Sequence, residues 1–448
     1  MNRSNFRVFR RTFFLVLTAA LATQRGVLAA DDDPTSIPLE QIRVFTEVLH
    51  LIKRDYVEPV DDKTLLENAI RGMLSGLDPH SAYLSDTEYT GLQEGTTGEF
   101  GGLGLEVGLE DGFIRVIAPI DDTPAQRAGV QAGDLIVRLD DTPVKGMSLD
   151  DAIDLMRGAP GAPILLTIMR EGQDAPMTIE VIRDIIKVKS IRTRMLEPGI
   201  AYVRISQFQA STGNDLRAAV VELNEQAGGA LKGLVLDLRN NPGGVLGAAV
   251  GVADVFLEDG LIVYTKGRIE DSEYEARARP PDLLAGAPVI VLVNEGSASA
   301  SEIVAGALQD RGRALIVGRK SFGKGSVQTI LPMPGDAALK LTTALYYTPS
   351  GRSIQAEGIK PDITIGKLRV EAPESGANTV ITEADLSRHL QNATSGADSN
   401  GTSDDESSAE DTVTDAASLA SQDYELYEAL NVLKGMILMQ ARASNPTH

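Results

Sequence analysis

Short apolar strands alternate with helical stretches between Ile200 and Tyr347, and this alternation restricts the fold more than any other feature of the chain. Helices are expected over 213–226, after Gly244 and over 301–309. Strands are expected between them, at 202–206, 233–238, 289–294, 314–318 and 339–347. Because strands and helices follow one another in turn, this region is predicted to be an α/β domain.

A different pattern begins at Gly101, where short strands are separated by Gly, Pro and Asp. This texture predicts a small β-rich module, with strands at 113–118, 134–139, 164–170 and 177–183. Ser148 is predicted to cap a helix whose Ile153 and Met156 face inward. The glycine-rich loop Gly101–Leu105 precedes a strand, so its N–H groups can hold a peptide carboxylate, although a tight hairpin entry is the alternative.

Helical and low-complexity segments flank these two regions. Apolar residues recur at helical spacing within 31–90, and leucines with Ile437 give 423–448 an amphipathic helix pattern. Each apolar stripe needs a covering surface, either on the same chain or on a second copy, and we predict a homo-oligomer formed through both helices. Residues 371–422 are acidic and poor in apolar side chains, which predicts a disordered linker.

The first thirty residues have the pattern of an export signal. Four arginines precede the apolar stretch 13–22, and small residues near Ala22 and Ala30 offer cleavage sites. We therefore predict a signal peptide over 1–30 and an exported, periplasmic protein. An uncleaved segment would instead leave the protein associated with the membrane.

Composition excludes several classes of function. The formal charge of -21 argues against a nucleic-acid partner, because such binding needs clustered Lys and Arg. The chain has no cysteine and no cluster of His, Asp and Glu with metal-ligand spacing. We therefore expect neither a metal nor another cofactor.

A serine-rich turn and a later lysine supply the candidate chemistry. The run Gly296–Glu302 reads Gly-Ser-Ala-Ser-Ala-Ser-Glu, and Lys324 lies within Phe-Gly-Lys-Gly. No histidine lies between residues 81 and 388, so Lys324 is the leading base if Ser299 is a nucleophile. The lysine must lose its proton to act, which requires burial or a nearby positive charge. Gln328 follows closely enough to orient the amine.

Two turns offer backbone donors for an oxyanion. Ser299 is expected where a strand turns into a helix, and the N–H of Ala300 has no helical partner at such a start. Asn-Asn-Pro-Gly-Gly follows the predicted strand 233–238, and its glycines let a carbonyl approach the N–H of Gly243 or Gly244. Each motif alone also fits an ordinary turn, and Gly318–Lys324 lacks the spacing of a phosphate-binding loop.

The combination of motifs resembles a known family. Gly102–Leu105 with Ala128–Asp134 resembles a PDZ domain. Followed in order by Asn241–Gly244, Gly296–Glu302 and Phe322–Gln328, it is similar to the carboxyl-terminal processing proteases. The resemblance implies a multi-domain α/β fold. A PDZ domain over 91–186 would be inserted before a protease core over 187–370 that is related to the crotonase-like and ClpP-like spiral folds.

The resemblance also implies a role for each matching residue. Ser299 would be the nucleophile, Lys324 the general base and Gln328 the residue that positions the lysine. The oxyanion hole maps onto the backbone N–H groups of Ala300 and of Gly243 or Gly244, with the choice between the glycines open. The peptide pocket of the PDZ domain is expected at Gly102, Leu103, Gly104, Leu105, Ile153 and Met156.

These roles predict an exported serine endopeptidase. It would recognise protein substrates through unstructured C-terminal regions, and its PDZ domain would recruit the substrate or gate the active site. An activating or adaptor protein is a further partner to consider. The alternatives are a catalytically silent PDZ scaffold that only binds peptides and a thioester hydrolase built on the same core.

Overall fold

The computed structural model describes residues 38–173, 175–269, 272–368 and 418–444. The predicted signal peptide lies outside these residues, as does the predicted linker up to residue 417. Among the described residues, no helix is both long and apolar enough to cross a bilayer. The chain divides into one unit that ends at Met73 and a larger unit that begins at Leu74.

The first unit contains α2 (Leu39–Asp55) and most of α3 (Asp62–Ser75). No residue of α2 is buried. Its exposed apolar side chains include those of Leu39, Ile42 and Phe45. The apolar stripe predicted for the N-terminal segment is therefore an open helix face within the described residues.

An antiparallel β module follows at residues 99–187. Its main sheet has the order β3-β4-β5-β7-β8 with β6 added to β5, and β2 pairs with β9. The hydroxyl of Ser148 accepts a hydrogen bond from the N–H of Asp151, which confirms the predicted start of α6. Met156 lies in the core of the module and Ile153 packs against that core. The element bounds are β2 (Glu99–Gly102), β3 (Leu105–Glu110), β4 (Phe113–Pro119), α5 (Pro124–Arg127), β5 (Leu135–Leu139), β6 (Thr142–Pro143), α6 (Leu149–Met156), β7 (Pro163–Met169), β8 (Met177–Ile182) and β9 (Asp184–Lys187).

A six-stranded sheet with the order β10-β11-β12-β15-β16-β19 forms the α/β core. The pair β10 and β11 is antiparallel, and the other neighbours are parallel. The alternation of strands and helices confirms the α/β order expected from the sequence. The bounds are β10 (Ile191–Glu197), β11 (Ile200–Ile205), α7 (Thr212–Gln226), β12 (Gly233–Asp237), α8 (Leu246–Asp254), β15 (Val289–Val293), α9 (Ala300–Asp310), β16 (Ala314–Gly318), β19 (Ile363–Thr364) and α11 (Tyr424–Ser444).

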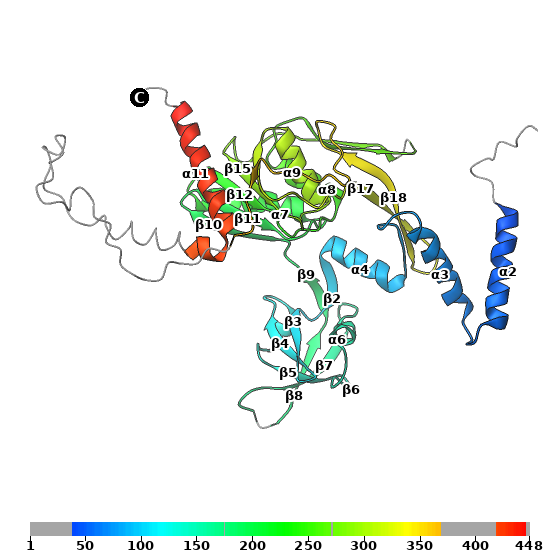
Figure 1. The fold of residues 1–448 in the computed structure, drawn as a ribbon. Helices are drawn as coiled ribbons and strands as arrows, with labels where there is room; N and C mark the ends of the chain where they lie inside the picture. Colours follow the sequence, from blue (N-terminus) through cyan, green and yellow to red (C-terminus); the bar gives the residue numbers. More distant parts are fainter. Residues whose placement is uncertain (1–37, 174, 270–271, 369–417, 445–448) are drawn as a thin grey trace, which may run out of the picture. The chain divides into compact units, whose positions relative to one another are not determined.

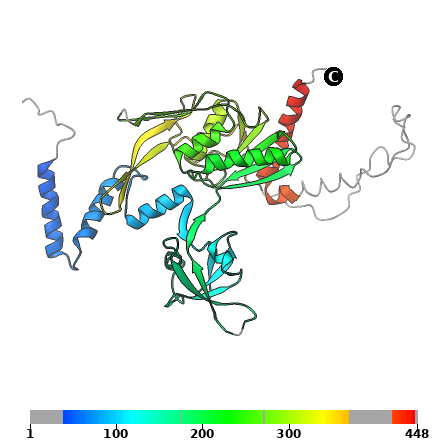
Figure 2. The same ribbon diagram turned by 180° about the vertical axis from the view of Figure 1, so that it is seen from behind.

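Different helices cover the two faces of this sheet (Figures 1 and 2). Successive side chains of a strand point to opposite faces. Leu234 and Leu236 of β12 belong to the core that contains α7, α8 and α9, whereas Val235 packs with the leucines of α11. The red helix α11 and the green helix α7 therefore lie on opposite faces, and both faces of β12 are buried.

A second sheet of the core is antiparallel. It has the order β1-β18-β13-β14, and β17 also pairs with β18. The short strand β1 pairs Ala82 with Lys340 of β18. The helix α4 follows β1 and spans the domain boundary that was predicted between residues 90 and 91. The N–H of Ala210 donates a hydrogen bond to the Thr96 carbonyl, which connects α4 to the core. The bounds are β1 (Ala82–Leu84), α4 (Asp86–Thr97), β13 (Leu261–Gly267), β14 (Tyr274–Arg277), β17 (Ser326–Pro332) and β18 (Ala338–Tyr347).

The C-terminal helix α11 packs on its own chain. Leu426, Leu430 and Leu433 are buried against the sheet, so the stripe that we expected to mediate self-association is covered from within the molecule. Residues 418–422, which we predicted to be linker, are helical. The physical reason is apolar burial, because Leu419 packs against the same cluster as the α11 leucines.

Candidate active site

Three loops leave the carboxyl ends of neighbouring strands. The strand β12 leads into Asn240–Gly244, β15 leads into Gly296–Ser299, and β16 leads into Phe322–Gly325. Because β12, β15 and β16 are adjacent and parallel, their loops meet at one edge of the sheet. The topology thus brings together the three motifs that are far apart in sequence.

Ser299 occupies the sharp turn between β15 and α9. Its φ is 55°, in the left-handed region that residues other than glycine rarely adopt. The N–H of Ser299 donates to the Glu302 carboxylate at 2.8 Å, which holds the turn in this conformation. The side chain is half-buried and lines a cavity at the sheet edge. Strain of this kind is often found at functional sites.

The neighbouring serines of the run are placed differently from Ser299. Ser297 and Ser301 are fully buried. The hydroxyl of Ser297 donates to the Leu238 carbonyl at 2.8 Å, and that of Ser301 donates to the Asn241 carbonyl at 3.0 Å. Both hydroxyls therefore serve the packing of the loops, and Ser299 is the serine of the run that faces the cavity.

Glu302 connects the serine turn to the lysine loop. Its buried carboxylate accepts hydrogen bonds from the N–H groups of Ser299, Gly323 and Lys324 at 2.7 to 2.8 Å, and from the Ser321 hydroxyl at 2.6 Å. Burial raises the pKa of Glu302 above its usual value, while the four donors act in the opposite direction. One side chain thereby fixes the backbone of both candidate catalytic residues.

Lys324 is half-buried, and its ammonium has a perturbed pKa. Burial, followed by the positive charge of Lys340, lowers this pKa, and the Asp78 carboxylate acts in the opposite direction. Within the described residues, no hydrogen bond or ion pair involves the Lys324 ammonium. A lysine with a lowered pKa and no anionic partner is suited to accept a proton.

The side-chain amide of Gln328 is held by hydroxyls of β17 and β18. Its Nε2 donates to the hydroxyls of Ser326 at 2.9 Å and Thr342 at 3.4 Å. Thr342 in turn donates to the Asp78 carboxylate at 3.1 Å. The described residues include no hydrogen bond between Gln328 and Lys324. Gln328 is thus anchored beside the lysine loop and linked to the segment that precedes β1.

The N–H groups of the two glycines are used differently. That of Gly243 donates to the side-chain oxygen of Asn241 at 2.9 Å. A Cβ on Gly243 would lie 2.8 Å from the Ser299 Cβ, so only glycine permits this close approach. Among the described residues, the N–H of Gly244 has no acceptor, and Gly244 lines the cavity beside Ala300. This pattern favours Gly244 over Gly243 as the partner of Ala300 in an oxyanion hole.

The cavity beside Ser299 has a volume of about 480 Å³. Apolar side chains from α4, α8, α9 and β17 line it, including Leu92, Leu246 and Ile303. The hydroxyl of Tyr346 is buried here, beside the side chain of Ser299. Burial, followed by the Glu302 charge, raises the pKa of Tyr346 well above its usual range, so this hydroxyl stays protonated. The cavity is therefore a largely apolar slot, with the protonated Tyr346 hydroxyl next to Ser299.

The β module has a second cavity, of about 230 Å³. All six residues predicted for the peptide pocket line it, namely Gly102, Leu103, Gly104, Leu105, Ile153 and Met156. Gly104 has a φ of 78°, and a Cβ there would lie 2.3 Å from Thr123, so the loop requires glycine. This groove between β3 and α6 has the place and the lining that an extended peptide terminus needs.

The sequence analysis assigns no role to Glu302 or Tyr346. For Glu302 a signal was present, because Ser-x-x-Glu at a helix start is the pattern in which the glutamate folds back onto the first N–H. Tyr346 comes from β18, and nothing local in its sequence points to the serine turn. The sequence analysis also assigns no role to His80. Burial, followed by the positive charge of Lys324, lowers the pKa of its imidazole.

Comparison with known proteins agrees with this geometry. Residues 199–365 match peptidase family S41, residues 115–170 match the PDZ domain, and residues 14–88 match the N-terminal domain of the activating protease CtpB. A carboxy-terminal-processing protease of Bartonella bacilliformis is 44% identical over 389 residues, which cover 86% of this chain and 89% of that protein. The chain belongs to peptidase family S41, among the carboxy-terminal-processing proteases.

Other relatives of this S41 peptidase carry the same description. A carboxyl-terminal-processing protease of a Synechocystis species is 37% identical over 320 residues, covering 70% of this chain and 74% of that protein. The solved structure of the photosystem II D1 C-terminal processing protease is 33% identical, covers 72% of this chain and 86% of that chain, and has a TM-score of 0.42. The protein is thus a serine-type peptidase with a PDZ domain, not a scaffold without activity. A relation of its core to the crotonase-like and ClpP-like folds stays a prediction.

Proposed function

We propose that this S41 peptidase cleaves proteins that it recognises through unstructured C-terminal regions, with Ser299 as nucleophile, Lys324 as general base and Gln328 as the residue that positions the lysine. The observation that carries the proposal is the Glu302 carboxylate, which binds the backbone of Ser299 and Lys324 together at the carboxyl edge of the sheet. Proton transfer between two groups is faster when both groups are held in a fixed relative position.

The proposed reaction proceeds through an acyl-enzyme. The Ser299 oxygen bonds to the substrate carbonyl carbon and gives its proton to the neutral Lys324 amine. The N–H groups of Gly244 and Ala300 stabilise the negative oxygen that develops. Lys324 then returns the proton to the departing amine as the C–N bond breaks. Water, deprotonated by the same lysine, hydrolyses the ester and releases Ser299.

We expect the PDZ groove to bind the free carboxylate of a substrate tail. A pair of peptides that share one sequence, one with a free C-terminus and one amidated, isolates this contribution. Hydrogen bonds to a charged group contribute about 1.5–3 kcal/mol, so the free acid should be cleaved with at least about tenfold higher kcat/KM. Equal kcat/KM for the two peptides would contradict recognition through the C-terminus while leaving the catalytic assignment in place.

The pH dependence of cleavage tests the role of Lys324. A base must be neutral, so kcat/KM should rise with pH as the amine loses its proton. Lys340→Met removes a positive charge that lowers the pKa of Lys324, and the acid limb should therefore move to higher pH. Asp78→Asn removes an opposing negative charge and should move the limb to lower pH.

Two comparisons complete this pH experiment. Lys232→Met is the matched control, because Lys232 precedes β12 at the opposite edge of the sheet and should leave the profile unchanged. His80 also titrates near the site, so the profile of His80→Gln separates its contribution from that of Lys324. If the acid limb of the kcat/KM profile lies at the same pH in Lys340→Met as in the wild type, Lys324 is not the base.

Self-association and export are part of the same proposal. The open apolar face of α2 supports a homo-oligomer, to which the exposed Leu438 and Met439 at the end of α11 can contribute. The solution mass of the wild type, compared with that of Phe45→Glu, tests this contact.

The arginine-rich and apolar start of the chain supports an exported, periplasmic protein, which cell fractionation tests. An adaptor protein would be found by capture on the inactive Ser299→Ala variant.

A further inference from the structure

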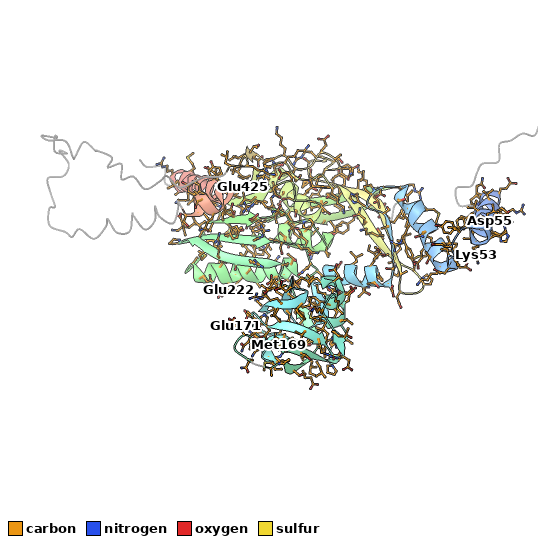
Figure 3. The ribbon with its side chains drawn as sticks, turned by 60° about the horizontal axis from the view of Figure 1, so that its bottom comes forward. Lys53, Asp55, Met169, Glu171, Glu222 and Glu425 are labelled. Carbon is orange, nitrogen blue, oxygen red and sulfur yellow. The ribbon has the colours of Figure 1, made fainter. Side chains whose placement is uncertain are left out.

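The start of α11 meets the active-site edge of the sheet. Asp423 and Glu425 lie where the helix begins, and Figure 3 labels Glu425 on the red helix at the core. Their partners are Arg239 and Arg319, the first arginines after β12 and β16. These two strands lead into the glycine turn and the lysine loop.

Arg239 is the more buried of the two arginines, with 12% of its side chain exposed. Its guanidinium donates to both oxygens of Asp423 at 2.7 and 2.8 Å and to Glu425 at 2.9 Å. It also donates to both oxygens of Asp237, the fully buried last residue of β12. Planar, bidentate pairing of this kind fixes direction as well as distance.

Arg319 makes a similar link at the end of β16. Its guanidinium pairs with Glu425 and, through Nε, with Glu295 at 3.0 Å. Its backbone N–H donates to the Val293 carbonyl at the end of β15. Glu425 therefore bridges the two arginines and joins the carboxyl ends of β12 and β16 across the strand that lies between them.

Arg239 stands directly before the glycine turn, and Arg319 stands between β16 and the lysine loop. Arg239 precedes Asn240, whose φ of 54° starts the turn that carries Gly243 and Gly244. Asn240 is also locked to Asn294 by two hydrogen bonds of 2.9 Å, one in each direction. Asn240 therefore couples the backbone next to Arg239 to the end of β15, which leads into the Ser299 turn.

We propose that α11 is a positioning element of the active site, in which Asp423 and Glu425 hold the oxyanion turn and the lysine loop at their working separation through Arg239 and Arg319. The inference rests on the proposed roles of Gly244, Ser299 and Lys324. The proposed helix lies outside the S41 match, which ends at residue 365, and it would act by positioning the catalytic loops.

Docking of the helix alone does not require these charges. Leu426, Leu430 and Leu433 bury its apolar face, and a separate ion pair, between Lys434 and Glu197 at 2.8 Å, lies further along the helix. Buried ion pairs lose much of their attraction to desolvation, so they are weak evidence for net stability. Their position at the catalytic edge is therefore the informative feature.

The test compares two full-length variants of the same helix. Glu425→Gln removes the charge that bridges both arginines and keeps the volume of the side chain. Lys434→Met breaks the Lys434–Glu197 ion pair of α11, which does not reach a catalytic loop. For each variant, kcat and KM for a peptide substrate are measured at a temperature where the thermal unfolding curve shows a fully folded protein. The rate of Ser299 labelling by a fluorophosphonate is measured in parallel.

A small misplacement of catalytic groups can reduce a rate by up to about 100-fold. We expect Glu425→Gln to lower kcat and the labelling rate by about 10- to 100-fold, with KM within twofold of wild type, and Lys434→Met to match wild type. Wild-type kcat in Glu425→Gln, or an equal loss in both variants, would overturn the inference. A wild-type protein that neither cleaves peptides nor is labelled at Ser299 would instead refute the proposed function itself.

Discussion

Cleavage of an unfolded protein substrate should fall by roughly 10⁴-fold or more when Ser299 is replaced by alanine. The Ser299 oxygen is the atom proposed to bond to the substrate, and the other two serines of the run cannot replace it, because the hydroxyls of Ser297 and Ser301 are buried and bonded to carbonyls. Lys324→Met should cause a comparable loss. The double variant should be little worse than either single one, since the two residues act as a unit.

Ser301→Ala is the matched control for the nucleophile. It removes one buried hydrogen bond, to the Asn241 carbonyl, which should cost about 1 kcal/mol of stability and leave most of the activity. Initial rates with a denatured protein substrate and the fluorophosphonate label distinguish the variants. Full activity in Ser299→Ala, or complete loss confined to Ser301→Ala, would rule out the assignment of the nucleophile.

Glu302→Ala should have the second largest effect, because it acts on both stability and chemistry. Removal of the carboxylate leaves four donors in a buried site without an acceptor, and each such group costs about 1–3 kcal/mol. We expect a loss of at least about 3 kcal/mol in the free energy of unfolding. The left-handed turn at Ser299 also loses the bond that maintains it, so activity should fall even in the folded fraction.

Urea unfolding and kcat, measured together, test this expectation. Glu222→Ala, on the exposed side of α7, is the matched control and should change stability by less than about 0.5 kcal/mol. Glu302→Gln keeps the volume but turns an amide N–H₂ toward N–H donors, so it should also be impaired. Wild-type stability in Glu302→Ala would mean that the four donors find other acceptors and that Glu302 does not organise the site.

The fold of the core and the place of Ser299 could be predicted from the sequence for a physical reason. Apolar runs such as Gly233–Leu238 and Val289–Asn294 specify buried strands, and strands followed by helices give parallel neighbours. Motifs at the ends of such strands must meet at one edge. The Gly-Ser-Ala-Ser-Ala-Ser-Glu run and the Lys324 loop could therefore be placed together although a whole helix and strand separate them.

Other parts of the site depended on contacts that sequence spacing does not encode. The preference for Gly244 over Gly243 in the proposed oxyanion hole rests on the Asn241 side chain, whose oxygen accepts a hydrogen bond from the N–H of Gly243. Tyr346 reaches the cavity from β18, which belongs to another sheet. The apolar stripe of α11 indicated that something covers it, but a stripe does not identify its partner, and the partner is the sheet of the same chain.

The docking of α11 also changes where this catalytic domain ends. The S41 match stops at residue 365, yet one face of the sheet is completed only by residues that follow position 417. A chain cut after residue 368 would expose Val235, Ile290 and Leu292 to water and leave Arg239 without Asp423 and Glu425. Such a fragment should aggregate through its bare sheet face. The smallest unit that can be produced and assayed therefore includes the C-terminal helix.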